Sequence, residues 1–206
     1  MARAWKVAGL RPGMSLRMVA RRVLAVRIAE FYSHAPFIHD PARVTELHDM
    51  RIAAKRLRYS LEIFKVCFPP ELEGLLSQVK AMQELLGEIH DADVLLPALS
   101  ERLAALARED EAALLARLHA ETDEAARLAA IRAALAPRAA DRRVGIYALL
   151  GRTLHRRRRS YAQFLDLWAR LETRGFRQQL EALTQRPAPS AGQAAADAPA
   201  LASAAT

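Results

Sequence analysis

The sequence predicts an all-α fold, an antiparallel bundle of about six helices with a basic groove. The chain of 206 residues contains only eight glycines. It lacks the alternation of apolar and polar residues that marks strands. Alanine, leucine, arginine and glutamate, which all favour helices, dominate the composition. Ten prolines divide the chain into helix-length segments. Because no apolar run reaches about 18 residues, we expect no transmembrane helix.

Prolines, glycines and capping residues set the expected helix boundaries. Asp40 followed by Pro41 predicts the start of a helix, because a cap and a proline in the first turn favour helix initiation. Gly87 predicts a helix end, and Pro97 permits a bend. The six expected helices are Ser15 to Ser33, Pro41 to Val66, Pro70 to Leu86, Ile89 to Arg108, Asp110 to Leu135 and Pro137 to Leu183.

Composition divides the chain into three parts. We expect an N-terminal extension over residues 1–14 and one helical domain over residues 15–185. Residues 186–206 are rich in proline, alanine and serine, and they are predicted to be disordered. The single cysteine, Cys67, lies among apolar residues and is expected in the core. One unpaired cysteine fits a reducing compartment, so we expect a cytoplasmic protein.

The charge balance favours an anionic partner. The net charge is +8, and arginine supplies 27 of the 31 cationic residues. The planar guanidinium group binds phosphate oxygens in pairs and keeps its charge when it is partly desolvated. A GC-rich genome also raises the arginine content, but it does not explain where the charges cluster.

The expected second helix carries a row of basic residues. At about 100° per residue, His48, Arg51, Lys55 and Arg58 share one flank, which we call the basic stripe, and Arg56 lies apart. Like charges at these spacings repel, so the row is unfavourable unless an anion covers it. A solvated polar face is the plain alternative. The core face is predicted to contain Met50, Ala53, Ala54, Leu57, Ser60, Leu61 and Phe64.

The last expected helix repeats this division into an apolar and a basic face. Its basic face contains Arg152, His155, Arg156 and Arg159, opposite an apolar arc of Ile146, Leu150, Leu154, Tyr161, Phe164, Leu165 and Trp168. Arg157 falls toward the apolar arc. It must therefore extend to solvent, reach a buried acceptor or mark a partner surface.

Histidine at the start of the basic stripe has two interpretations. Beside an anion, His48 would be protonated and both of its ring nitrogens would donate. Alternatively, a neutral His48 caps the loop before the helix. The helical wheel favours neither interpretation.

Two segments of the chain resemble the CHAD domain, the conserved histidine alpha-helical domain. They are LHDMRIAAKRLRYSLEIF, from Leu47 to Phe64, and VKAMQELLGEIHDADVLL, from Val79 to Leu96, within a resemblance that is strongest from Arg43 to Leu99. The resemblance implies a helical bundle with a positively charged groove that binds inorganic polyphosphate. It also implies association with polyphosphate granules.

Matching positions carry the implied binding residues. These are His48, Arg51, Lys55, Arg56, Arg58 and Lys80. The resemblance implies that Asp91 and Asp93 orient the basic residues rather than bind the ligand. Arg152, His155, Arg156 and Arg159 complete the expected polyphosphate-binding set.

The motif occurs once, whereas family members usually contain two copies related by a pseudo-twofold axis. The segment from Arg142 to Arg159 could be a degenerate second copy. The chain could instead be a half-sized form that completes its groove as a homodimer.

The sequence favours a binding protein over an enzyme. His90 and Asp91 form an isolated His-Asp pair, with Asp93 and His119 as the nearest additional candidates, and a metal site needs a more complete set of ligands. There is no glycine-rich phosphate loop. We therefore expect no catalytic residue, no metal and no cofactor.

Two other functions would use the same arginine-rich faces. A nucleic-acid-binding module would need bases to stack on aromatic rings, for which Tyr59 and Tyr161 are the candidates near the stripe. A protein-interaction module would present the segment from Arg156 to Arg159 to a partner. Binding of inorganic polyphosphate without catalysis remains the leading hypothesis.

Overall fold

The computed structural model describes residues 3–136 and 141–185, and their fold is all-α without strands. The expected tail 186–206 and the expected helix start at Pro137 lie outside these residues. No helix in the described ranges is long and apolar enough to cross a membrane. The elements are α1 (Leu16–Tyr32), η1 (Ala35–Phe37), α2 (Val44–Ile63), η2 (Lys65–Cys67), α3 (Leu72–Ala120), α4 (Glu124–Leu135), α5 (Val144–Thr173) and α6 (Phe176–Gln185).

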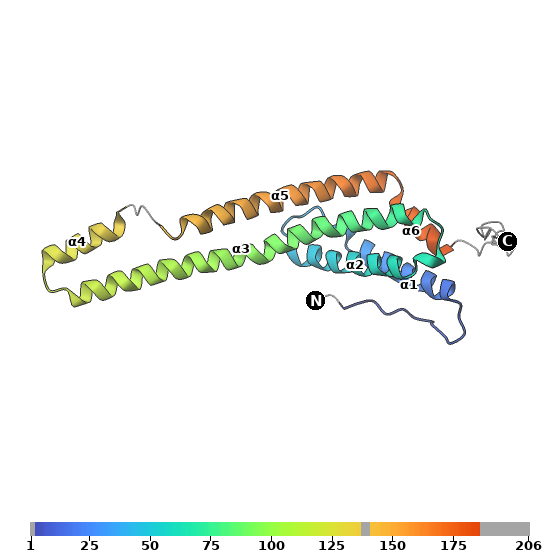
Figure 1. Cartoon of the computed structure of the whole chain (residues 1–206), viewed down its shortest axis with the longest axis horizontal. Helices are drawn as coiled ribbons and strands as arrows, with labels where there is room; N and C mark the ends of the chain where they lie inside the picture. Colours follow the sequence, from blue (N-terminus) through green and yellow to red (C-terminus); the bar gives the residue numbers. More distant parts are fainter. Residues whose placement is uncertain (1–2, 137–140, 186–206) are drawn as a thin grey trace, which may run out of the picture.

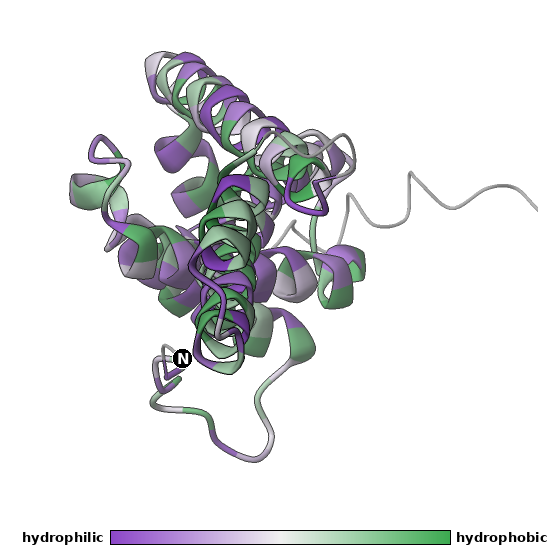
Figure 2. Ribbon diagram, turned by 90° about the vertical axis from the view of Figure 1, so that its left-hand side faces the viewer, coloured by the Kyte–Doolittle hydropathy of each residue, from purple (hydrophilic) through white to green (hydrophobic). Residues whose placement is uncertain are grey.

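The molecule is elongated, with α3 and α5 side by side along most of its length (Figure 1). Helices α1, α2 and α6 pack around one end of this pair, while α4 lies at the other end. In the end-on view, hydrophobic and hydrophilic residues alternate around the helices (Figure 2). This alternation is typical of amphipathic helices that pack along one face.

Helix α3 joins segments that the sequence analysis separated. It runs for 49 residues without interruption at Gly87 or Pro97, so the predicted break between Leu86 and Ile89 was wrong. Leu86 and Ile89 are both 1% exposed. Ending the helix between them would displace one of these side chains from the core. Proline inside a helix costs about 3 kcal/mol, and burial of several apolar side chains offsets that cost.

Three other helix boundaries differ from the predicted ones because of local turns and caps. The Asp40 carboxylate accepts a hydrogen bond from the Ala42 amide at 2.9 Å, so it stabilises a turn, and α2 begins three residues later than Pro41, at Val44. The expected last helix divides at Gly175, whose φ of 67° is a left-handed conformation that favours glycine. The expected fifth helix, Asp110 to Leu135, is divided: its first part belongs to α3, which ends at Ala120, and α4 begins after Asp123, whose side chain caps it.

The core lies where five helices meet. The predicted core face of α2 is confirmed for Met50, Ala53, Ala54, Leu57 and Leu61, which are at most 1% exposed. Ser60 and Phe64 are half-buried. Cys67 is buried, as predicted. An aromatic cluster joins α1 to α5 and consists of Phe31, Tyr32, Phe164 and Trp168.

A buried carboxylate connects the N-terminal segment, α1 and α2. Glu30 is 2% exposed and accepts hydrogen bonds from Arg27 and, at 2.6 Å, from Arg56. Arg27 also donates to the Trp5 carbonyl at 2.7 Å, so residues before α1 are held against it. The desolvation of such a buried carboxylate is costly, so the two arginines that donate to Glu30 are needed to offset it.

We predict that Glu30→Ala destabilises the fold by about 3 kcal/mol, because it removes the buried carboxylate that Arg27 and Arg56 share. Urea denaturation followed by circular dichroism measures the change. The control is Glu46→Ala, which removes a surface partner of Arg43 and should cost less than about 1 kcal/mol. Equal losses in the two variants would show that the Glu30 network does not stabilise the fold.

Candidate functional site

The basic stripe lies along the seam between α2 and α3, which run antiparallel. His48 Nδ1 lies 2.9 Å from His90 Nδ1. A Cβ atom on Gly87 would lie 3.7 Å from Arg51 Nε, so Arg51 crosses α3 at Gly87. A step of three residues along α2, from His48 to Arg51, therefore matches a step of three residues back along α3, from His90 to Gly87. The same register places Lys55 opposite Gln83 and Arg58 opposite Lys80.

Two guanidinium groups of the stripe have donors without an acceptor. Arg51 Nε and Arg58 Nε are buried and make no hydrogen bond in the part of the chain that the structure describes. Arg58 Nε is 3.8 Å from the Glu62 carboxylate, too far for a hydrogen bond. Buried N–H groups are nearly always paired in folded proteins. Each of these guanidinium groups therefore keeps one donor that the described residues leave unsatisfied.

The lysines of the site are also without carboxylate partners among the described residues. Lys55 and Lys80 are exposed, one on each helix of the seam. Tyr59 lies between the cations of α2, with its ring centroid 5.8 Å from Lys55 Nζ and 4.6 Å from Arg58 Cζ. Arg58 has the Glu62 carboxylate at 3.8 Å, whereas Lys55 and Lys80 add positive charge to the seam without an ion pair among the described residues.

The two histidines close one end of the seam. They border an open cavity of about 370 Å³ that is lined by Val44, Thr45, His48, Asp49, His90, Asp93 and Val94. Burial, and then the proximity of His90, lower the pKa of His48 below its ordinary value of 6.5. The contact between two Nδ1 atoms requires one to donate and the other to accept, so it is lost when both rings are fully protonated.

From the sequence, His90 was predicted only as half of an isolated His-Asp pair. The structure pairs it with His48 instead, and His90 is a residue of the site that the analysis missed. A signal was present in the mirrored spacing of the two motifs, since positions 48 and 51 on α2 correspond to positions 90 and 87 on α3.

Arg157 reaches a buried acceptor, one of its three predicted outcomes. Its guanidinium donates to the Asp93 carboxylate and, at 2.8 Å, to the Pro41 carbonyl. The Asp93 side chain is 9% exposed, whereas Asp91 is exposed. Asp93 therefore orients a cation, the role that the resemblance implies for it. Arg157 in turn links α5 to the loop before α2.

The basic face of α5 is separated from the stripe by α3 (Figure 1). Ser160 donates to Glu88 on α3, so Arg156 and Arg152, one and two turns earlier, lie on the flank next to Glu88. His155 is farther around the helix. The exposed residues Glu84, Glu88 and Asp91 lie on α3 between the two basic surfaces. The cavity beside His48 does not join these surfaces, and the expected basic groove stays a prediction.

Arg56 differs from the other cations assigned by the resemblance. Its guanidinium donates to Glu30 on α1, on the opposite side of α2 from the seam. Its position apart from the stripe agrees with the helical wheel. In the structure, Arg56 contributes to the packing of α1 on α2 and is not brought together with Arg51 and Arg58.

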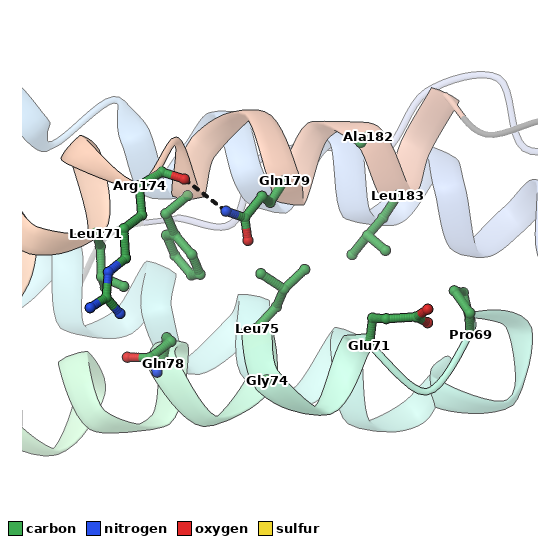
Figure 3. A pocket seen from close by; sticks show the side chains of 11 residues that line it. Pro69, Glu71, Gly74, Leu75, Gln78, Leu171, Arg174, Gln179, Ala182 and Leu183 are labelled. Carbon is green, nitrogen blue, oxygen red and sulfur yellow. Dashed lines mark hydrogen bonds between the residues drawn. The ribbon is translucent and has the colours of Figure 1, made fainter.

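A larger cavity lies at the far end of the bundle. It has a volume of about 460 Å³ and a largely apolar lining from α3, α5 and α6, with Leu75 and Leu183 across from each other (Figure 3). Gln179 donates to the Arg174 carbonyl at its edge, at 2.8 Å. Within residues 3–136 and 141–185, no group of three or more His, Cys, Asp or Glu side chains could hold a metal ion.

Comparison with known proteins assigns a family to the first half of the chain. Residues 2–100 match the family described as CHAD domain, and this range includes α1, α2 and the part of α3 that lines the seam. No curated protein and no solved structure matches the chain.

We predict that stability decreases as the pH falls below about 6.5, because the unfolded chain then binds a proton at His48 that the folded chain does not. Each such proton changes the free energy of unfolding by at most about 1.4 kcal/mol per pH unit. In His48→Phe, urea denaturation between pH 5 and pH 7.5 should show a smaller pH slope. Some slope should remain, since burial also lowers the pKa of His34.

Exposed His39 provides the matched control, and His39→Gln should keep the slope of the unsubstituted protein. An unchanged slope in His48→Phe would contradict the lowered pKa of His48 as a source of the pH dependence.

Proposed function

The chain belongs to the CHAD domain family, and from this premise we propose that it binds inorganic polyphosphate along the α2–α3 seam without catalysing a reaction. The observation that carries the proposal is the pair of buried, unpaired donors at Arg51 Nε and Arg58 Nε. They lie two turns apart, with Lys55 between them. A linear polyanion can meet such a row with successive phosphate groups, whereas a single small anion can meet one position at a time.

Cations from three helices would contribute in different ways. Arg51 and Arg58 would donate to phosphate oxygens, a charge-assisted contact stronger than one between neutral groups. Lys55 and Lys80 would act as point charges from the two sides of the seam. The second wall would come from the exposed α5 residues that the sequence analysis included in the site, Arg152, His155, Arg156 and Arg159.

Binding without catalysis fits the contacts of the candidate acid–base groups. His48 and His90 contact each other, and Asp93 is held by Arg157. A hydrolytic site would instead aim such groups at a water molecule or a metal ion. In the proposed complex, a nearby phosphate would favour the protonated form of His48, which then donates from both nitrogens.

We predict that the triple variant Arg51→Ala, Lys55→Ala, Arg58→Ala loses tenfold or more in polyphosphate affinity at about 0.15 M salt. Removal of about three phosphate contacts should also reduce the slope of log K against log salt concentration by about 2. Fluorescence anisotropy with labelled polyphosphate at several salt concentrations measures both quantities.

The control removes the same net charge elsewhere, by substituting alanine for the exposed residues Arg108, Arg117 and Arg132. It should change the affinity less than twofold and leave the slope unaltered. If both triple variants lose affinity equally, net charge rather than the seam determines binding, and the site assignment fails.

We predict that polyphosphate displaces RNA or DNA from the protein far better than the reverse. The candidates for base stacking are few: the exposed Tyr59 ring already contacts two cations, and half-buried Tyr161 donates to the Ile38 carbonyl at 2.7 Å. Competition at fixed salt, with phosphate concentrations matched, measures the order. Stronger displacement by RNA or DNA would favour the nucleic-acid hypothesis.

A further inference from the structure

Beyond the bundle, α3 and α5 continue as a two-helix arm. We define the arm as residues 100–120 of α3 and 144–154 of α5, which extend past the ends of α1 and α2 toward α4 (Figure 1). Among these described residues, only Leu106 and Thr153 are buried. A helix pair with so small a core leaves much of its apolar surface in water, where it lowers stability unless a partner covers it.

An apolar stripe on α5 runs through both the bundle and the arm. Tyr147, Leu154, Tyr161 and Trp168 are seven residues apart, so they lie on one side of the helix. In the bundle, Trp168 is 7% exposed and packs against Phe31. In the arm, Tyr147 is 58% exposed and Leu154 is 36% exposed. The arm therefore continues a core-facing stripe past the helices that cover it.

The same side of α3 carries small residues in the arm. The Asp93 carboxylate accepts from Arg157, so it marks the side of α3 that faces α5. Ser100 and Ala107 follow Asp93 by seven and fourteen residues and therefore lie on the same side, with Ala104 between them. All three are exposed. Small residues allow another helix to approach closely, so the stripe of α5 and this side of α3 form one surface for helical packing.

The charge distribution indicates which partner can approach this surface. Residues 101–150 contain eight arginines and eight acidic residues, so the whole net charge of +8 lies outside them. The positively charged bundles of two copies therefore repel each other, whereas their arms do not. Arg102 of the arm pairs with Glu109 at 3.0 Å, and Arg142, just before the α5 part of the arm, pairs with Asp110 at 2.9 Å. The arm itself contains four arginines and four acidic residues, so it has no net charge that would repel a second arm.

We propose that the arm is a homodimer interface, in which the arms of two copies pack as a four-helix bundle and cover Tyr147 and Leu154. With a rise of 1.5 Å per residue, the arm of α3 is about 30 Å long. The α5 part of the arm is about 16 Å long, so at about 10 Å width per helix the face presents roughly 500 Å² before side-chain relief is counted. Two such faces bury about 1,000 Å², the lower limit expected of a specific interface. The dimer does not depend on polyphosphate binding.

Sedimentation velocity of the full chain, without polyphosphate and across about 1 to 100 μM, tests the proposal. The unsubstituted protein should sediment as a dimer. The double variant Tyr147→Glu, Leu154→Glu should sediment as a monomer, because it would bury four carboxylates in each dimer. The matched control is Ile63→Glu, Val66→Glu at the far end of the bundle, where both side chains are more than 70% exposed. It should remain dimeric.

A milder double variant, Tyr147→Ala, Leu154→Ala, separates loss of the interface from loss of folding. It should keep the helical circular dichroism of the unsubstituted protein and raise the dimer Kd at least tenfold. A monomeric unsubstituted protein at 100 μM, or an arm variant that dimerises like the control, would overturn the proposal.

Discussion

The antiparallel packing of α2 on α3 determines where each cation of the basic stripe lies. Its contacts come from apolar residues on the two helices: Leu57, Leu61, Met50, Met82, Leu86 and Ile89, all at most 1% exposed. At about 1.5–3 kcal/mol for each buried side chain, the six contribute roughly 9–18 kcal/mol. Two unpaired arginine donors cost about 1–3 kcal/mol each. Packing therefore outweighs this cost, and the seam keeps two donors that the described residues leave unpaired.

The apolar period of each helix made the all-α class and the core faces predictable, because burial depends on which residues share a side. Helix ends were less predictable. Gly87 and Pro97 are strong local signals, yet α3 continues through both because α2 and α5 pack along it. The sequence also indicated one apolar arc on α5. It did not indicate where that arc becomes exposed, because this depends on how far α1 and α2 extend beside α5.

The stripe itself was visible from spacing within one helix, whereas its partners were not. The contact of His48 with His90 and the contact of Arg56 with Glu30 depend on how two helices meet, and a single helical wheel contains no such information. Arg157 is an intermediate case. Its position within an apolar arc required some acceptor, but only the fold identifies that acceptor as Asp93.

The most direct measurement of the central claim is a crystal structure of the full chain with tripolyphosphate. The account predicts phosphate oxygens within hydrogen-bond distance of Arg51 Nε and Arg58 Nε, with Lys55 and Lys80 beside the same chain of phosphates. Tripolyphosphate bound only to the Arg152–Arg159 face of α5, with both Nε donors of α2 still unpaired, would contradict it.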